Sequence, residues 1–152
     1  PGDRAEARTI GRRYEEAAAE YTALLDLTGS PAAALNGRGV ARSRLGALDE
    51  AIADQEAAIE HDPEFAKAHF DLGACRHARR ELDRAIACYD RALSIDPDYV
   101  EALNNRAIAS LMRGDLEGAR ASWLRALEID GRRKTIRHNL KILLAKIASL
   151  GR

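Results

Sequence analysis

The sequence predicts an all-α protein, a solenoid of antiparallel helix pairs stacked side by side. Residues of one type return every 34 positions, and this period is typical of a repeat that cannot bury its apolar face without a neighbour. Aromatic residues make up only 5% of the chain, so the core must consist of Ala, Leu and Ile, which favours helices. The periodic columns are Ala17, Ala51, Ala85 and Ala119; Ala58, Ala92 and Ala126; Tyr14, Leu48, Leu82 and Leu116; and Asp62, Asp96 and Asp130.

The period defines three full repeats, 32–65, 66–99 and 100–133, each expected to hold two amphipathic helices. In the middle repeat, Leu72 and Cys75 follow Ala68 at helical spacing. The second helix of that repeat has an apolar stripe with the same spacing. The stripe comprises Leu82, Ala85, Ile86, Tyr89, Ala92 and Leu93.

Glycine, aspartate and proline mark the helix ends. Gly46 and Gly114 stand between the two helices of their repeats, where a left-handed residue satisfies the last carbonyls of the first helix. Asp115 follows Gly114 and is expected to cap the second helix. Second helices are expected to end at Asp62-Pro63 and Asp96-Pro97, because proline cannot continue the hydrogen-bond ladder.

The N-terminal region departs from this pattern. Residues 1–31 are expected to form a partial first repeat. Its first helix is reduced to about Asp3–Gly11, its second contains Tyr14 and Leu27, and Gly29-Ser30-Pro31 closes it.

The C-terminal region, residues 134–150, is expected to form a capping helix, since the last repeat of a solenoid needs an atypical element over its open face. Its apolar residues are Ile136, Leu140, Leu143, Ile147 and Leu150. The succession Ile142, Leu143, Leu144 spreads apolar surface over more than one face. This excess suits a cap, self-association with a second copy of the chain, or cover by a segment outside this sequence.

Charge argues against a polyanionic main ligand. The 152 residues, expected to form the single domain 1–152, contain 24 Lys and Arg and 24 Asp and Glu. A neutral chain of mixed signs gives no reason to expect nucleic acid or an anionic membrane. Residues 131–152 hold seven basic and no acidic residues, which suits a solvated helix face or a surface for an anionic partner.

Hydropathy, the cysteines and the first two residues bear on the compartment and on the origin of the chain. No apolar run approaches the roughly 20 residues that span a bilayer, so membrane insertion is not expected. Cys75 and Cys88 are the only cysteines and are expected to be free, partly buried thiols. A cytoplasmic setting follows. The chain opens at Pro1-Gly2 without methionine, which is compatible with an excised or a processed piece of a longer protein.

No residue pattern predicts catalysis, a metal or a cofactor. His69 and His77 lie eight residues apart on one expected helix, and Cys75 falls on another side of it. The sequence has no paired histidines or cysteines at metal-binding spacing and no glycine-rich phosphate loop. We therefore expect a protein that is not an enzyme.

These features resemble the tetratricopeptide repeat (TPR), whose pattern has a Leu-Gly pair in the first helix, an alanine in the second and a closing proline. The repeat 66–99 matches with Leu72, Gly73, Ala85, Tyr89 and Pro97; 32–65 with Gly39, Ala51 and Pro63; 100–133 with Ala119 and Trp123. Arg38, Arg76 and Arg106 depart from the pattern. The resemblance implies a right-handed superhelix with a concave groove lined by the first helices.

The resemblance also implies which residues line that groove. The candidate peptide-binding residues are Asn36, Lys67, Phe70, Asp71, His77, Asn104, Asn105, Ile108, Leu111, His138 and Asn139. Asn105 and Asn139 share a column with Asp71; some family members bind a peptide backbone through asparagines there. An amide both donates and accepts, so these asparagines either bind a peptide or satisfy nearby backbone.

Other family members clamp a peptide carboxylate with lysine and asparagine. The matching lysine positions hold Asn36, Phe70 and Asn104 here, which argues against an acidic tail as ligand. The expected function is a scaffold that binds a protein or peptide segment of modest charge in the groove. The alternative is a recognition or regulatory segment of a larger enzyme or of a secretion or assembly factor. RNA binding by a related 35-residue repeat is disfavoured by the period and the charge.

Overall fold

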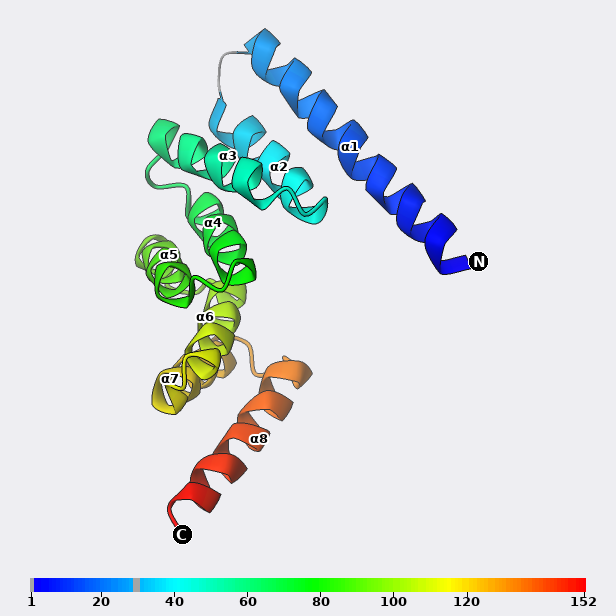
Figure 1. Ribbon diagram of the computed structural model, residues 1–152. Coiled ribbons are helices and arrows are strands. Elements are labelled where there is room, and N and C mark those ends of the chain that lie inside the picture. Colours follow the sequence, from blue (N-terminus) through cyan, green and yellow to red (C-terminus); the bar gives the residue numbers. More distant parts are fainter. Residues whose placement is uncertain (1, 29–30) are drawn as a thin grey trace.

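Antiparallel helices follow one another along the whole molecule. The computed structural model describes residues 2–28 and 31–152, and all regular structure in these ranges is α-helical. The helices are α1 (Gly2–Thr28), α2 (Pro31–Arg44), α3 (Leu48–His61), α4 (Ala66–Ala78), α5 (Leu82–Ile95), α6 (Val100–Met112), α7 (Leu116–Ile129) and α8 (Lys134–Leu150). Each helix packs on the next, and α2 also touches α4, as α4 touches α6. The pairs α2/α3, α4/α5 and α6/α7 thus stack into a curved array, which confirms the all-α solenoid (Figure 1).

Three equivalent turns separate the two helices of each pair. Gly46, Arg80 and Gly114 all have positive φ angles, of 81°, 64° and 88°. The next residue in each turn donates its backbone N–H to a carbonyl five positions earlier, over 2.8–2.9 Å. The left-handed glycines are confirmed, and Arg80 adopts the same conformation without being a glycine.

The second helices end at aspartates, as predicted. Asp62, Asp96 and Asp130 follow the last residues of α3, α5 and α7 in extended conformation. Each Oδ1 accepts a 3.1 Å hydrogen bond from the backbone N–H two residues later. The Asp115 side chain accepts from the Gly118 N–H at 2.8 Å, which confirms the predicted cap of α7.

A seam of small residues lets the two helices of each pair approach closely. On the second helices, Ala51, Ala85 and Ala119 are 0% exposed. At the matching positions of the first helices, Ala41, Cys75 and Ala109 are buried as well. A Cβ atom on Gly73 would lie 2.7 Å from the Tyr89 ring, so this approach requires glycine.

The N-terminal expectation of two short helices is wrong. α1 is one continuous helix through Gly11, Arg12 and Arg13, where the turn between two helices was expected. Only its C-terminal half has the register of the other second helices, and its N-terminal half projects away from the body (Figure 1). The expected close at Gly29-Ser30 lies outside the described residues, and Pro31 begins α2.

The C-terminal helix α8 covers the third repeat. Ile136, Leu140 and Leu143 are buried in the cluster that also holds Trp123 of α7. Ile142 and Leu144 stay exposed on other faces of α8.

The two cysteines lie in the middle repeat. Cys75 is buried and Cys88 half-buried, and both are free thiols whose pKa is raised by burial.

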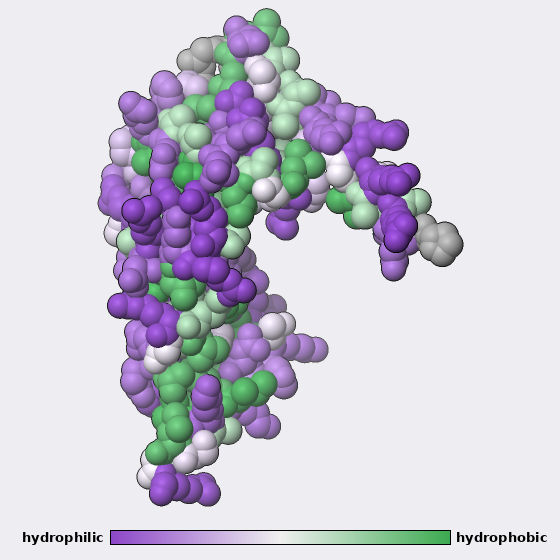
Figure 2. All heavy atoms as spheres, in the orientation of Figure 1, coloured by the Kyte–Doolittle hydropathy of each residue, from purple (hydrophilic) through white to green (hydrophobic). Residues whose placement is uncertain are grey.

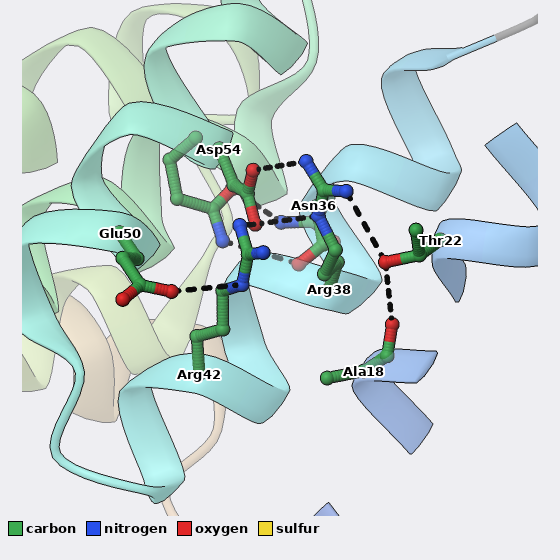
Figure 3. Close-up of polar contacts among 8 residues, drawn as sticks. Ala18, Thr22, Asn36, Arg38, Arg42, Glu50 and Asp54 are labelled. Carbon is green, nitrogen blue, oxygen red and sulfur yellow. Dashed lines mark hydrogen bonds and ion pairs between the residues drawn. The ribbon is translucent and has the colours of Figure 1, made fainter. Parts of the chain in front are cut away.

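The three arginines that depart from the repeat pattern each bind an acidic residue on a second helix. Arg38 donates to both carboxylate oxygens of Asp54, at 2.8 and 3.0 Å, and this hydrogen bonding raises the pKa of the guanidinium. Figure 3 shows that Arg38 also reaches Thr22 of α1. Arg76 pairs with Glu81 and Glu56.

Arg106 repeats the contacts of Arg38 two units later. It donates to Asp90, 16 residues before it, and to Ser122, 16 residues after it. Arg38 has its two partners, Thr22 and Asp54, at the same separations. An arginine in this column therefore joins its first helix to the second helices on both sides.

Candidate functional site

One side of the solenoid is lined by the first helices α2, α4 and α6, with α1 at one end and α8 at the other. Four hollows follow one another along it, with volumes of about 320, 430, 240 and 370 Å³ from the N-terminal end. Val40 lines the first two hollows, and Phe70 and Asn105 line the second and third. We call this surface the groove; Figure 2 shows the molecule hollowed between α1 and α8.

The first hollow has aromatic walls from α1. Tyr14 and Tyr21 face α2 across it, and Lys67 of α4 reaches its far side. Tyr21 lies so close to α2 that a Cβ atom on Gly37 would come within 2.4 Å of its ring. Glycine at position 37 therefore allows α1 to approach α2.

A polar network separates the first hollow from the second. Asn36 is buried, and its Nδ2 donates to Gln55 Oε1 and to Asp71 Oδ2, both at 2.8 Å. Lys67 Nζ lies 2.8 Å from the same oxygen of Asp71. The structure thus brings Asn36, Lys67 and Asp71 together, and the Asp71 charge is compensated from within the groove.

Aromatic rings form the floor at the middle of the groove. The Phe70 ring lies 5.1 Å from the Tyr99 ring and 6.0 Å from the Tyr89 ring, centroid to centroid. Burial raises the pKa of Tyr99 to about 12. Burial also raises the pKa of Tyr89, and Asn105 partly opposes this effect. The buried Tyr89 hydroxyl makes no hydrogen bond of ordinary geometry within the described part of the chain, and the Asn105 amide lies beside it.

The third hollow lies between α6 and the start of α8. Arg133 Nη2 donates to Glu101 Oε1 over 2.7 Å, and this bond lowers the pKa of Glu101. Asn104 lines the hollow, but its Oδ1 accepts a 2.9 Å hydrogen bond from Trp123 Nε1. Asn104 therefore holds the buried indole, and Asn105 is the asparagine of this pair without such a bond to the core.

The fourth hollow is lined mainly by aliphatic side chains of α6 and α8. Ile108 and Leu111 of α6 face Asn139 and Ile142 of α8, with Lys146 at the edge. Ile142 is 56% exposed although it is aliphatic. The Asn139 amide is the one polar side chain besides Lys146 that lines this hollow among the described residues.

Two predicted residues lie outside the four hollows. His77 is half-buried, its Nε2 is 3.1 Å from Met112 Sδ, and its pKa is lowered by burial and by Arg80. His138 is exposed on α8. The other nine predicted residues line a hollow.

Sequence reasoning missed the tyrosines of α1 and the Glu101–Arg133 pair. Tyr14 was expected only as a residue of the second helix of a partial repeat, and Tyr21 was not singled out as a groove residue. Both line the first hollow, because α1 ends the array. Glu101 and Arg133 are 32 residues apart, close to one repeat length. This near-repeat spacing was the available signal for a contact between neighbouring first helices.

Among the described residues, no group of three or more His, Cys, Asp or Glu side chains could hold a metal ion. Within the same residues, every helix is too short or too polar to cross a bilayer. Amides, aromatic rings and aliphatic side chains line the groove, and two ion pairs lie in it, Lys67–Asp71 and Arg133–Glu101.

Solved structures with the same fold include two TPR domains and MamA. The first TPR of Spaghetti (RPAP3), bound to the HSP90 peptide SRMEEVD, is 20% identical, with a TM-score of 0.75 over 78% of this chain and 94% of that chain. The first TPR domain of human RPAP3 is 21% identical, with a TM-score of 0.74 over the same shares. MamA is 18% identical, with a TM-score of 0.82 over 94% of this chain and 83% of that chain.

Sequence comparison gives the same family. No curated protein sequence matches the chain. Three tetratricopeptide repeat models match residues 7–59, 66–99 and 88–121. This repeat is generally a non-catalytic protein-interaction module. The repeat matches, the helix pairs and the shared fold together establish that the chain is a tetratricopeptide repeat protein.

Proposed function

We propose that the chain is a non-catalytic scaffold that binds an extended peptide or a helical segment of a partner protein along the groove. The observation that carries this proposal is the run of adjoining hollows in which apolar side chains alternate with amides. Phe70, Ile108 and Ile142 offer apolar contacts, and Asn105 and Asn139 offer hydrogen bonds beside them. An extended segment needs both kinds of contact, because its backbone and its side chains must be satisfied together.

The charges of the groove favour a ligand of modest charge. Lys67 pairs with Asp71, and Arg133 pairs with Glu101. Lys134 and Lys146 add positive charge near α8. We therefore propose a segment with two or more apolar anchors and a low net charge.

A strongly acidic C-terminal tail fits less well. The similar RPAP3 domain holds the HSP90 peptide SRMEEVD, but the family's carboxylate-clamp lysine positions hold Asn36, Phe70 and Asn104 here. Asn36 and Asn104 already bind Asp71 and Trp123. Fluorescence titration with SRMEEVD is expected to show no saturable binding.

The proposal is tested by selecting peptides from a displayed random library on the intact chain and titrating them against variants. The groove variant is Asn105→Ala/Ile142→Ser, which changes two residues outside the buried core. It is expected to weaken the selected peptides at least about tenfold, since removing central contacts costs more than 1 kcal/mol each. The matched control is Leu124→Ser, an aliphatic residue 42% exposed on α7 outside the four hollows.

Leu124→Ser is expected to leave the affinities unchanged. Peptides that bind the groove variant as tightly as the parent chain would refute the groove as the binding surface. Equal losses with both variants would refute it too, because the loss would then come from the fold.

A further inference from the structure

Four charged residues join the two helices of the first full repeat. Arg38 Nη2 lies 2.8 Å from Asp54 Oδ1, and Arg42 Nη1 lies 2.8 Å from Asp54 Oδ2. Arg42 Nε lies 3.5 Å from Glu50 (Figure 3). The basic residues stand on α2 and the acidic residues on α3, so this cluster acts between the helices of one pair.

The same four charges occur 34 residues earlier, and all of them lie on α1. The position-matched residues are Arg4, Arg8, Glu16 and Glu20. Their signs and spacings equal those of Arg38, Arg42, Glu50 and Asp54. α1 thus carries the basic half of such a cluster in its N-terminal part and the acidic half in its C-terminal part.

The small-residue seam is repeated on α1 as well. Ala41 and Ala51, at matching positions of α2 and α3, are 3% and 0% exposed. Their equivalents on α1 are Ala7 and Ala17. Ala7 is exposed and Ala17 is only half-buried. Two halves of a fourth helix pair are therefore encoded, but they do not cover each other.

A continuous helix cannot bring these halves together. Arg4 and Glu20 are 16 residues apart on α1, which is about 24 Å at a rise of about 1.5 Å per residue. Residues 3–10 are all exposed, including the aliphatic Ile10. The N-terminal half of α1 projects from the body as a free arm (Figure 1).

We infer that a second copy of this chain supplies the missing cover. Two α1 helices pair antiparallel, so that residues 2–10 of each lie on residues 14–22 of the other. In this register Arg4 faces Glu20 of the second copy, Arg8 faces Glu16, and Ala7 meets Ala17. A two-fold axis near Arg12 repeats each contact, as expected for an isologous dimer made by exchange of an identical element.

Exchange between chains fits the structure better than closure within one chain. Closure would break α1 at Gly11-Arg12-Arg13, where the helix is unbroken. Pairing between two chains keeps α1 continuous, and each half of α1 is covered by the complementary half of the second copy. It uses α1 and not the exposed residues of α8. The covered part of α1 includes Tyr14, Ala17 and Tyr21 of the first hollow, so the dimer closes that hollow and leaves the other three open to a ligand.

Charge reversal distinguishes these arrangements. The basic half is reversed by Arg4→Glu/Arg8→Glu and the acidic half by Glu16→Arg/Glu20→Arg; all four residues are exposed. We expect the parent chain to dimerise in light scattering and sedimentation, and each double variant to raise the dimer dissociation constant at least about tenfold through like-charge contacts. Mixing the two variants is expected to restore a one-to-one heterodimer, because complementarity then exists only between different chains.

The control is Glu15→Arg, an exposed residue on α1 in the column of the exposed Asp49, Asp83 and Glu117. It is expected to dimerise like the parent chain, and circular dichroism checks that all variants keep their helix content. A parent chain that stays monomeric at the highest accessible concentration would overturn the inference. So would a dimer that neither double variant weakens, or a mixture of the two that remains monomeric.

Discussion

The terminal helix α1 and the interior helix pairs carry the same columns of residues in different surroundings. Ala51, Ala85 and Ala119 are completely buried, whereas Ala17 in the same column is half-buried. Asp54 is buried between two arginines, whereas Glu20, 34 residues earlier, is exposed. Residues at equivalent repeat positions therefore form the same packing face on each helix. How much this face contributes to stability depends on whether another helix covers it.

Position-matched substitutions measure this contribution directly. Two substitutions are compared each time, one in an interior helix pair and one at the equivalent repeat position of α1. The protein is kept dilute, so that α1 stays uncovered in solution. Because the chemistry of each pair is similar, the difference in the free energy of unfolding reports the covering helix.

The largest effect is expected for Asp54→Ala against Glu20→Ala. The Asp54 carboxylate accepts three hydrogen bonds of 2.8–3.0 Å from Arg38 and Arg42. Its removal leaves two guanidinium groups in a half-buried site, which we expect to cost about 3 kcal/mol. Glu20→Ala on the exposed helix face is expected to stay within about 0.5 kcal/mol.

Urea unfolding followed by circular dichroism at 222 nm gives both values. Similar losses from the two substitutions would mean that the ion cluster contributes nothing beyond the helix it stands on.

An intermediate effect is expected for Ala85→Leu against Ala17→Leu. Ala85 has no exposed surface where α5 meets α4, so three added carbons must push the helices apart, at about 1–3 kcal/mol. Ala17 has open space beside it, and the larger side chain is expected to change stability by less than about 0.5 kcal/mol. The same urea series tests this pair; a loss at Ala17 as large as at Ala85 would show that α1 is already covered.

Much of the fold was predictable because the repeat fixes both the positions of the buried residues and the ends of the helices. The seam at Ala51, Ala85 and Ala119 and the stops at Asp62 and Asp96 require only helical spacing and the properties of proline. The continuity of α1 was not predictable from the period. A turn at residues 11–13 is stabilised only when the first helix folds back and buries the small-residue seam. Without that burial, local helix propensity favours one continuous helix.

The repeat positions that line the groove were predictable, but the directions of their side chains were not. The family resemblance selected nine residues that line a hollow, and it did not distinguish Asn104 from Asn105. Asn104 holds the Trp123 indole, because that ring occupies the neighbouring buried position on α7. Which of the two amides turns inward depends on the residue that faces it from the next helix, and a column of equivalent positions does not contain that information.

The smallest effect compares the turns, with Arg80→Gly against Arg12→Gly. Arg80 is a non-glycine residue at φ 64° in the turn between α4 and α5. Glycine adopts this conformation without strain, so Arg80→Gly is expected to raise the free energy of unfolding by about 0.5–1 kcal/mol. Arg12 occupies the same column in the interior of α1, where glycine lowers helix stability by about 0.5–1 kcal/mol relative to a good helix former. One substitution at equivalent positions should therefore have opposite signs in the urea series. If Arg12→Gly stabilised the chain as Arg80→Gly does, residue 12 would have to lie in a left-handed turn in solution, and α1 would be a closed helix pair within one chain and not the open helix that a second copy can cover.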